Sequence, residues 1–302
     1  MKYTVVIPAK NEEDGIGQTL ESLMNQSVAP QLCVVVDDGS TDQTPVIVRS
    51  IAERYEQVLY HKNENRKNYR VGGHVVEVFN IGKHVIDRQN IPYDYIIKMD
   101  ADLSFGKEFM ENIFRKYGRQ DDLGIISGTP YYFQDGKKIF EYSPLWHTHG
   151  QFKIYNRKCL EDMGGIRQML GWDCADNIQA IEVGWQTWAA RDVHYMMHRR
   201  IGNKSSLVKG RINQGKGAYN LRYDPFYMLI KMVHDLFKPP YFIGSLAYGI
   251  GYFKSMINGR QGRLSKKQRK ILRRLLWSSL LERAQSRRFF LFQVAGKQLK
   301  VR

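Results

Sequence analysis

Short apolar runs alternate with helix-patterned segments through the first third of the chain. The runs at 3–9, 32–36 and 95–99 are rich in Val and Ile, whereas segments 10–26 and 43–56 repeat apolar residues at helical spacing. Strands that alternate with helices in this way favour βαβ units and a mostly parallel sheet. Because the runs are continuously apolar, we expect these strands to be covered by helices on both faces.

Polar clusters follow three of the predicted strands: Asn-Glu at 11–12, Asp-Asp at 37–38 and Asp-x-Asp at 100–102. Each cluster alone could be an ordinary polar turn. Parallel α/β sheets, however, bind ligands at the carboxyl ends of their strands. Two neighbouring carboxylates repel each other unless a cation or hydrogen-bond donors offset the repulsion, and Mg²⁺ and Mn²⁺ are commonly held by one or two carboxylates plus phosphate oxygens. Together the clusters predict a metal–phosphate site.

Three sequence blocks carry a resemblance to a known family: VVIPAKNEE at 5–13, VVVDDGSTD at 34–42 and MDAD at 99–102. In order and spacing they resemble the signature blocks of family 2 glycosyltransferases with a GT-A fold. The resemblance continues through 150–166 and 171–185. It implies a Rossmann-like, mostly parallel catalytic domain. It also implies an inverting transferase that moves a sugar from a nucleotide-diphosphate sugar to an acceptor hydroxyl with Mg²⁺ or Mn²⁺ as cofactor.

The resemblance also implies roles for individual residues on the donor side. The nucleoside would be contacted by the strand-end segment, and the base or ribose by the Asp-Asp pair, for which an Asx-turn is the structural alternative. Asp102 would be the direct metal ligand, and Asp100 would lie nearer the ribose and phosphate while also counting as a metal candidate. The residues so assigned are Pro8, Ala9, Glu12, Asp37, Asp38, Asp100, Ala101 and Asp102.

Segment 66–82 is rich in cations and then contains Gly72-Gly73. Arg70 could reach a donor phosphate, and Gly73 permits a close backbone approach. The alternative is a solvated loop before a helix. Arg70 and Gly73 are therefore predicted as donor contacts.

The acceptor side requires a carboxylate that deprotonates the attacking hydroxyl. In the family that carboxylate lies about eleven residues before a Gly-aromatic pair, and Asp173 stands at that distance from Gly184-Trp185. Asp176 is its rival, since i,i+3 spacing would place both carboxylates on one helix face. A helix N-cap is the structural alternative for Asp173. We expect Asp173 to be the base.

Several histidines and arginines follow the predicted base. His198 with Arg199 and Arg200 resembles the position at which GT-A enzymes place a further metal or diphosphate contact, because His suits Mn²⁺ and Arg suits diphosphate. A purely structural histidine is the alternative. His147 and His149 have no evident third ligand, so we predict them to be acceptor-cleft or core residues.

Charge divides the chain into two unlike parts. Residues 1–190 hold 21 Lys and Arg against 26 Asp and Glu, whereas 191–302 hold 25 against 4. Residues 241–257 are mostly apolar, at the lower limit of a membrane-spanning length. A basic helix with apolar positions Leu272, Leu275, Leu276 and Leu280 follows. Such a helix is typical of an anionic bilayer surface; packing on the catalytic domain, an oligomer contact and a nucleic-acid patch are the alternatives.

The sequence therefore predicts a GT-A catalytic domain at 1–225 and a membrane-associating helical extension at 226–302. Three separated cysteines indicate a reducing, cytoplasmic setting, with the protein peripheral on the inner face of the cell membrane. The expected partners are a nucleotide-sugar donor, a carbohydrate or lipid-linked acceptor and an anionic membrane surface, with no nucleic acid. Two alternatives remain open: a nucleotidyltransferase, which normally has a Gly-rich loop after its first strand, and a basic nucleic-acid-binding protein with an inactive α/β domain. The sugar, the base, the acceptor and the oligomeric state are not predicted.

Overall fold

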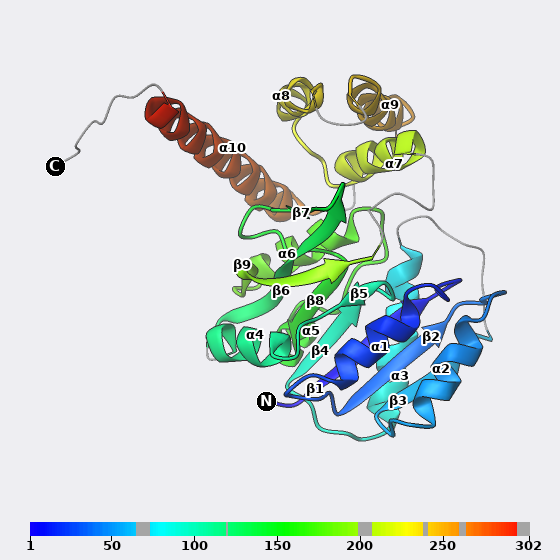
Figure 1. Ribbon diagram of the computed structural model, residues 1–302. Helices are drawn as coiled ribbons and strands as arrows, with labels where there is room; N and C mark the ends of the chain where they lie inside the picture. The colour runs from blue at the N-terminus through cyan, green and yellow to red at the C-terminus, as the bar shows by residue number, and fades with distance from the viewer. Residues whose placement is uncertain (65–72, 119, 199–206, 238–240, 260–263, 295–302) are drawn as a thin grey trace.

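The chain forms one mixed sheet with helices on both faces (Figure 1). The computed structural model describes residues 1–64, 73–118, 120–198, 207–237, 241–259 and 264–294. The strands are β1 (Tyr3–Ala9), β2 (Leu32–Asp37), β3 (Val58–Lys62), β4 (Tyr95–Met99), β5 (Leu103–Ser104), β6 (Leu123–Gln134), β7 (Lys137–Phe140), β8 (Phe152–Asn156) and β9 (Gln186–Met197). The helices are α1 (Ile16–Met24), α2 (Thr44–Ala52), α3 (His74–Arg88), α4 (Phe109–Tyr117), α5 (Arg157–Asp162), α6 (Trp172–Glu182), α7 (Leu207–Asn220), α8 (Pro225–Asp235), α9 (Ile243–Ile257) and α10 (Lys266–Val294).

The sheet is parallel in one half and mixed in the other. Its order is β3-β2-β1-β4-β8-β6-β9-β5, and β7 pairs with the end of β6. The parallel arrangement expected from the sequence holds for β3, β2, β1 and β4. Beyond β4, strand β8 runs antiparallel to both of its neighbours, while β6 and β9 are parallel. The carboxyl ends of β1, β2 and β4 therefore share one edge, where the predicted donor residues begin.

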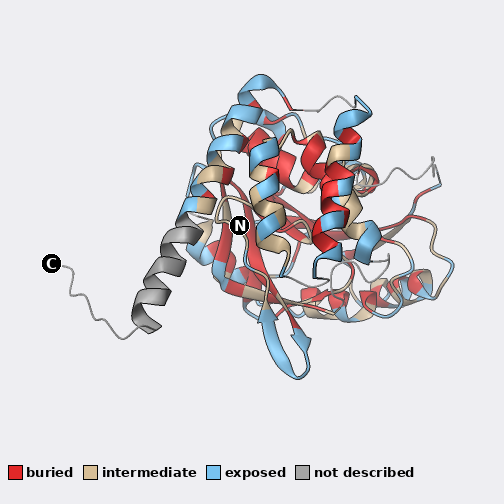
Figure 2. Ribbon diagram, turned by 90° about the horizontal axis from the view of Figure 1, so that it is seen from above, coloured by how far each residue is buried: buried red, intermediate tan, exposed pale blue. Residues whose placement is uncertain are grey.

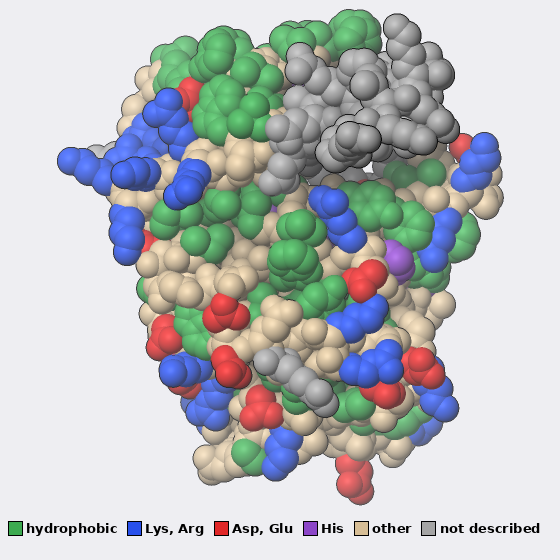
Figure 3. Space-filling view, turned by 90° about the vertical axis from the view of Figure 1, so that its left-hand side faces the viewer, with side chains coloured by type: hydrophobic (Ala, Val, Ile, Leu, Met, Phe, Trp, Pro, Cys, Tyr) green, Lys and Arg blue, Asp and Glu red, His purple; other side chains and the backbone are tan. Residues whose placement is uncertain are grey.

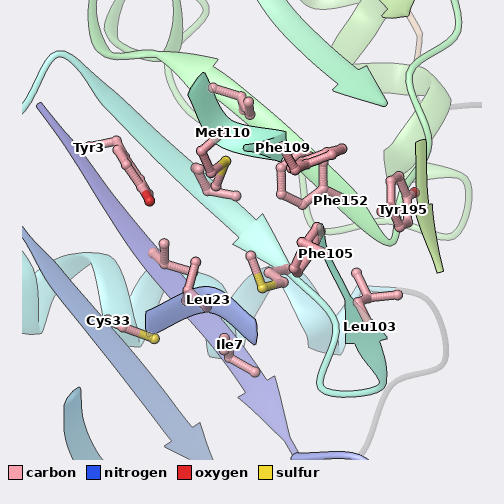
Figure 4. Packing of buried hydrophobic residues seen from close by; sticks show 14 of the residues in the cluster. Tyr3, Ile7, Leu23, Cys33, Leu103, Phe105, Phe109, Met110, Phe152 and Tyr195 are labelled. Carbon is pink, nitrogen blue, oxygen red and sulfur yellow. The ribbon is translucent and has the colours of Figure 1, made fainter. Parts of the chain in front are cut away.

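Helices cover both faces of the sheet because successive strand residues point to opposite sides. On one face, α1, α2 and α4 pack on Tyr3, Val5 and Ile7 of β1, in the core that Figure 4 shows from close by. On the other face, α3, α5, α6 and the first part of α10 pack on Val6 and the alternate residues of β2. Burial on both sides explains why the strands read as continuous apolar runs.

Helices α7, α8 and α9 form a separate small cluster at one end of the molecule. Tyr219, Met228, Tyr248 and Tyr252 are buried within it. Helices α7 and α9 approach backbone to backbone, since a Cβ atom on Gly215 would overlap the carbonyl oxygen of Tyr248. Helix α7 thus belongs with the helices beyond residue 226, and a domain boundary at 225/226 would divide this cluster.

The basic helix α10 packs on protein through part of its apolar stripe. Leu272 and Leu276 are buried in the core that contains α6, and the indole of Trp277 stacks on Phe226 of α8. This arrangement is the packing alternative that the sequence left open, at least for these leucines. No helix in the described part of the chain is both long and apolar enough to cross a membrane.

Candidate active site at the carboxyl edge of the sheet

The Asp-x-Asp turn after β4 is fixed from two sides. The Asp100 carboxylate accepts a hydrogen bond from Lys98 Nζ, and its backbone N–H donates to the carbonyl of Gln151 at 2.8 Å. The Thr19 hydroxyl of α1 donates to the carbonyl of the buried Ala101, also at 2.8 Å. The carboxylates of Asp100 and Asp102 remain partly exposed. The turn is rigid, whereas its two acids are accessible.

His198 lies directly beside this turn. Its backbone N–H donates to the carbonyl of Asp102 at 2.9 Å, which places the residue after β9 against the second acid of the turn, directly before β5. Its Nε2 atom is buried and has no hydrogen-bond partner among the residues that the structure describes. Burial also lowers the pKa of His198, so the ring is neutral near pH 7. A neutral, unpartnered imidazole nitrogen is the form in which His binds metals.

The residues at the turn fit a divalent metal whose shell is completed by its substrate. Across the described residues, no group of three or more His, Cys, Asp or Glu side chains is arranged to hold a metal ion on its own. Asp102 and His198 would supply two protein ligands, and Mg²⁺ or Mn²⁺ commonly takes the remainder from phosphate oxygens and water. Arg70, Arg199 and Arg200, predicted to contact phosphate, lie outside the described residues.

The Asp-Asp pair after β2 is buried and already hydrogen-bonded. Asp37 accepts from the backbone N–H of Ser40 at 2.8 Å and from the Tyr60 hydroxyl at 2.7 Å. The first of these bonds is the turn that the sequence offered as the structural alternative. Asp38 accepts from Asn63 Nδ2 at 2.9 Å and lies 2.6 Å from His74 Nε2. Both carboxylates therefore shape the edge of the sheet whether or not they also contact a donor.

The predicted nucleoside segment lies against this pair. The carbonyl of the buried Ala9 accepts from the backbone N–H of Asp38 at 2.9 Å, and Pro8 pairs with Val36 in the sheet. The backbone N–H of Glu12 donates to the Thr44 hydroxyl at 2.8 Å. The strand-end residues of β1 and β2 are thus brought together, as the sequence predicts.

Gly73 lies close to the protein backbone, and its predicted contact with a donor stays a prediction. A Cβ atom at this position would stand 3.1 Å from the backbone of Gln168, so a larger residue would push α3 away from that segment. Gly73 is followed by His74, the partner of Asp38. Sequence reasoning missed His74, although a polar ring directly after a glycine at a helix start is a signal that could have been weighed.

Asp173 stands in the first turn of α6 and is partly exposed. A Cβ atom on Gly150 would lie 3.0 Å from the Asp173 Cβ, so the absence of a side chain there lets the loop before β8 lie against the carboxylate. The carbonyl of Gly150 accepts from Lys98 Nζ at 2.8 Å, and the same ammonium binds Asp100. Lys98 therefore links the Asp-x-Asp turn to the loop that lies beside Asp173.

Asp176 occupies a different environment from its neighbour one turn earlier. Its carboxylate is fully buried, lies 2.7 Å from Lys153 Nζ through both oxygens, and accepts from the Tyr155 hydroxyl at 2.6 Å. Burial raises the pKa of Asp176, and the bonds to Lys153 and Tyr155 oppose that rise. Spacing alone suggested that the two acids share one helix face, but in the structure Asp176 is buried in the core whereas Asp173 is partly exposed. This burial speaks against Asp176 as the base.

Two buried lysines that support the site were also missed from the sequence. Lys98 of β4 pairs in register with Lys153 of β8, and both ammonium groups lie 5.4 Å from the ring centroid of Trp172. Lys153 Nζ donates to the Asp173 carbonyl at 2.6 Å as well as to Asp176. The available signal was a lysine in the middle of each otherwise apolar strand, because an unpaired charge is rarely buried.

A cavity of about 400 Å³ opens beside Asp173, between the start of α6 and helices α7, α8 and α9. Asp173, His147 and Lys231 contribute polar side chains to its wall, and Leu170, Leu221 and Tyr248 contribute apolar surface. Desolvation lowers the pKa of His147 and of His149, so both rings are neutral near pH 7. His147 lines this cavity and His149 is buried in the core, the two kinds of position that the sequence analysis considered for these histidines.

Comparisons with known proteins identify the family and the fold of the chain. Residues 4–171 match the model of the family described as glycosyl transferase family 2. Of the curated relatives, 4,4'-diaponeurosporenoate glycosyltransferase from Staphylococcus haemolyticus (strain JCSC1435) is 32% identical over 155 residues, or 50% of this chain and 36% of the relative. The chain therefore spans about a third of the length of the curated relatives it matches.

Solved structures show the fold over most of the chain. A mannosyltransferase, PcManGT from Pyrobaculum calidifontis in complex with GDP-Man and Mn²⁺, aligns with a TM-score of 0.54 at 18% identity and covers 93% of this chain and 86% of its own. TarS 1–349 of S. aureus in complex with UDP-GlcNAc aligns with a TM-score of 0.52 at 15% identity and covers 88% and 94%. The chain belongs to glycosyl transferase family 2 and has a GT-A fold, which confirms the resemblance.

Proposed function

We propose that the protein transfers a sugar from a nucleotide-diphosphate sugar to an acceptor hydroxyl, with inversion at the anomeric carbon and with the help of Mg²⁺ or Mn²⁺. The observation that carries this proposal is the link through Lys98, which joins the Asp-x-Asp turn to the loop beside Asp173. The solved relatives named above were crystallised with GDP-Man and Mn²⁺ or with UDP-GlcNAc, which supports a donor of this class.

On the donor side, the edge formed by β1 and β2 would receive the nucleoside. Pro8, Ala9, Glu12 and Asp38 lie there, and Asp37 holds the turn behind them. Asp102 and His198 would hold the metal, with Asp100 nearer the ribose. When bound, the ion neutralises the negative charge that develops on the leaving diphosphate. Gly73 and the undescribed Arg70, Arg199 and Arg200 complete the proposed donor contacts.

On the acceptor side, Asp173 would act as the general base. As the acceptor oxygen bonds to the anomeric carbon, the bond to the diphosphate breaks and the hydroxyl proton passes to the Asp173 carboxylate. The carboxylate is suited to this role because it is accessible and lines a cavity, while Lys153 holds its helix in place through the Asp173 carbonyl. Asp176, fully paired in the core, would be a positioning residue.

The test is a panel of nucleotide sugars, each measured with and without Mn²⁺. Ligands that bind the folded state raise the melting temperature, so a matching donor should stabilise the protein only in the presence of the metal. The anomeric configuration of the product, read by NMR, should be opposite to that of the donor. Retention of configuration would overturn the assignment of Asp173 as a base, and metal-independent turnover would overturn the role of Asp102.

We further propose that α8 and α9 dock the enzyme on the inner face of the cell membrane, as a cytoplasmic, peripheral protein with a lipid-linked acceptor. Large apolar side chains are exposed along both helices, and Figure 2 shows the exposed faces in pale blue on the helices nearest the viewer. Tyr248 of α9 and Lys231 of α8 also line the cavity at Asp173, so the two helices of the proposed membrane face also form part of the wall of the cavity that contains the base. The curated relatives are named for the acceptor diaponeurosporenoate, which supports a lipid-like acceptor.

Vesicle cosedimentation of the full chain tests this docking. Replacing Leu246 and Ile250 of α9 by Gln should reduce vesicle binding, because both side chains are exposed and would lose apolar burial in the bilayer. Ile139→Gln with Phe133→Gln, on the β6–β7 hairpin, is the matched control and should have no effect. Equal binding by the α9 variant and the wild type would exclude α9 as the docking face.

A further inference from the structure

A second cavity, of about 470 Å³, adjoins the cavity at Asp173 through Tyr223 but contains none of the proposed catalytic or donor residues. It is enclosed by the end of α7, the start of α8, the last turns of α9 and the first turns of α10. Its lining is strongly basic, with five cationic side chains and a single acidic one. The cations are Arg222, Lys266, Arg269, Lys270 and Arg273, and the acid is Asp224.

The single acid caps a helix and pairs with one of the five cations, so the cavity keeps a net positive charge. One oxygen of Asp224 caps α8 by accepting from the backbone N–H of Phe226 at 2.9 Å. The other lies 3.5 Å from Arg273 Nε. Lys266, Arg269 and Lys270 form no ion pair with any other residue that the structure describes. Cations gathered in this way repel one another, and a bound anion would offset that repulsion.

The donor groups in the cavity match the chemistry of a phosphate. Arginine side chains bind phosphate oxygens through two parallel N–H groups, and lysine adds a compact charge. Arg222 is oriented by its own neighbour, since its guanidinium donates to the Tyr219 hydroxyl at 2.9 Å and lies 4.9 Å from that ring centroid. The cavity is large enough for a phosphate together with a small attached group.

The cavity opens next to the apolar face of α8 and α9. Met256 of α9 lines it and is itself 41% exposed. The exposed apolar side chains recur at helical spacing on both helices, as Phe226, Leu229 and Val233 on α8 and as Ile243, Leu246, Ile250 and Ile257 on α9. Figure 3 shows hydrophobic side chains gathered at this end of the molecule. A phosphate held in the cavity would therefore have apolar surface beside it.

We propose that this cavity binds the phosphate of an anionic phospholipid headgroup, while the α8–α9 face contacts the lipid chains. The inference deepens the membrane docking proposed above and rests on it, but it does not depend on sugar transfer. A nucleic acid would use the cations and leave the apolar face uncovered, whereas a phospholipid uses both. In this proposal the basic residues of α10 form a specific binding pocket for the headgroup, whereas a diffuse attraction would involve all basic residues of the helix equally.

The experiment compares two charge-matched variants of the full chain. Arg269→Ala with Lys270→Ala removes two cations from the cavity wall; Lys267→Ala with Arg274→Ala removes two exposed cations of the same helix that do not line it. Binding is measured to vesicles of phosphatidylcholine alone and of phosphatidylcholine with phosphatidylglycerol. All four side chains are exposed, so melting temperatures should stay within a few degrees of the wild type.

Removing two cations weakens the general attraction to the anionic vesicles equally in both variants, by up to about thirtyfold. The pocket variant should lose at least about tenfold more affinity than the matched variant, because it also loses its contacts with the phosphate. Equal losses would overturn the pocket and leave a diffuse basic surface. Displacement of the protein from vesicles by inorganic phosphate or glycerol phosphate at low millimolar concentration, or by a short RNA, would also overturn the lipid assignment.

Donor binding separates this proposal from the one on catalysis. Both variants should keep the metal-dependent stabilisation by a matching nucleotide sugar, because neither pair lies at the carboxyl edge of the sheet. Equal losses of vesicle affinity by the two variants, with intact donor binding, would refute the pocket alone. Absence of donor binding in the wild type, with the vesicle result unchanged, would refute the proposed reaction and leave the pocket standing.

Discussion

The candidate active site contains aspartates in two opposite environments. Some are accessible to solvent, and another lies in the buried ionic cluster that supports them. Asp102 and Asp173 are partly exposed at the ends of β4 and at the start of α6. Asp176 is fully enclosed by Lys153 and Tyr155. An accessible carboxylate costs little stability and is available to a ligand, whereas a buried one is stable only with its partners. Loss of the first should therefore stop chemistry, and loss of the second should unfold the protein.

Replacing Asp173 by Asn is the sharpest test of this difference. Asn has nearly the same size but cannot accept the acceptor proton, so transfer should fall by about 10²–10⁴-fold, the usual contribution of a general base. The melting temperature and the metal-dependent stabilisation by the donor should remain close to those of the wild type. Asp121→Asn, an exposed acid before β6, is the control and should transfer at the normal rate. Persistent transfer by Asp173→Asn would remove the residue from the catalytic role.

Asp102→Asn should have the second-largest effect, and on a different step. Without the carboxylate the metal loses a ligand, so we expect turnover to fall by about 10²–10³-fold and the donor to stabilise the protein less in Mn²⁺. Raising the Mn²⁺ concentration should recover part of the activity, which a general-base variant would not show. An unchanged Mn²⁺ titration curve would contradict a metal site at Asp102.

The exposed acids could be predicted from the sequence because the patterns that mark them are local. Asp-x-Asp directly after an apolar strand, and Asp173 at a fixed distance from Gly184-Trp185, need no knowledge of distant contacts. The same holds for the alternation of strands and helices in β1 to β4. The position of Asp102 beside His198 is different, since it depends on how β9 returns to the edge of the sheet.

The buried cluster could not be predicted because it depends on strand register. Lys98 and Lys153 are 55 positions apart and meet only because β4 and β8 are antiparallel neighbours. Spacing suggested that Asp176 and Asp173 lie on one helix face, but spacing does not indicate which side of α6 the sheet covers. In the same way, the leucines of α10 matched a bilayer-facing helix, and only the tertiary packing shows Leu272 against α6.

Breaking the buried cluster should reduce stability. Lys153→Met leaves the Asp176 carboxylate buried without its cation, which typically costs about 3–5 kcal/mol. Tyr155→Phe removes one hydrogen bond to the same carboxylate and should cost about 1.5–3 kcal/mol. Urea unfolding of the purified variants measures both losses, and any loss of activity should follow the loss of folded protein.

A double variant distinguishes an ionic cluster from simple packing. Lys153→Met combined with Asp176→Leu removes both charges, so it should be less destabilised than the sum of the single variants. Additive losses would mean that the two side chains do not interact in the folded protein. A normal melting temperature for Lys153→Met alone would show that Asp176 is not a buried charge.

The smallest effect concerns His149, which lies in the core behind the cavity wall. Desolvation lowers its pKa from 6.5 to about 3, so the folded protein keeps the ring neutral while the unfolded chain takes up a proton below pH 6.5. The contribution of this ring to stability is therefore fully present above pH 6.5 and is lost progressively as the pH falls toward 3, at up to about 1.4 kcal/mol per pH unit.

His149→Gln tests this pH dependence between pH 6.5 and 5, where most carboxylates stay ionised. Over that range the free energy of unfolding of the variant should fall by about 2 kcal/mol less than that of the wild type. The difference in the free energy of unfolding is read from urea unfolding of both proteins at each pH. Identical pH dependence of wild type and His149→Gln would mean that the ring is already charged or solvated in the folded protein. Water would then reach the cavity wall behind Asp173, and the base would work in a more polar cleft than the burial of His149 indicates.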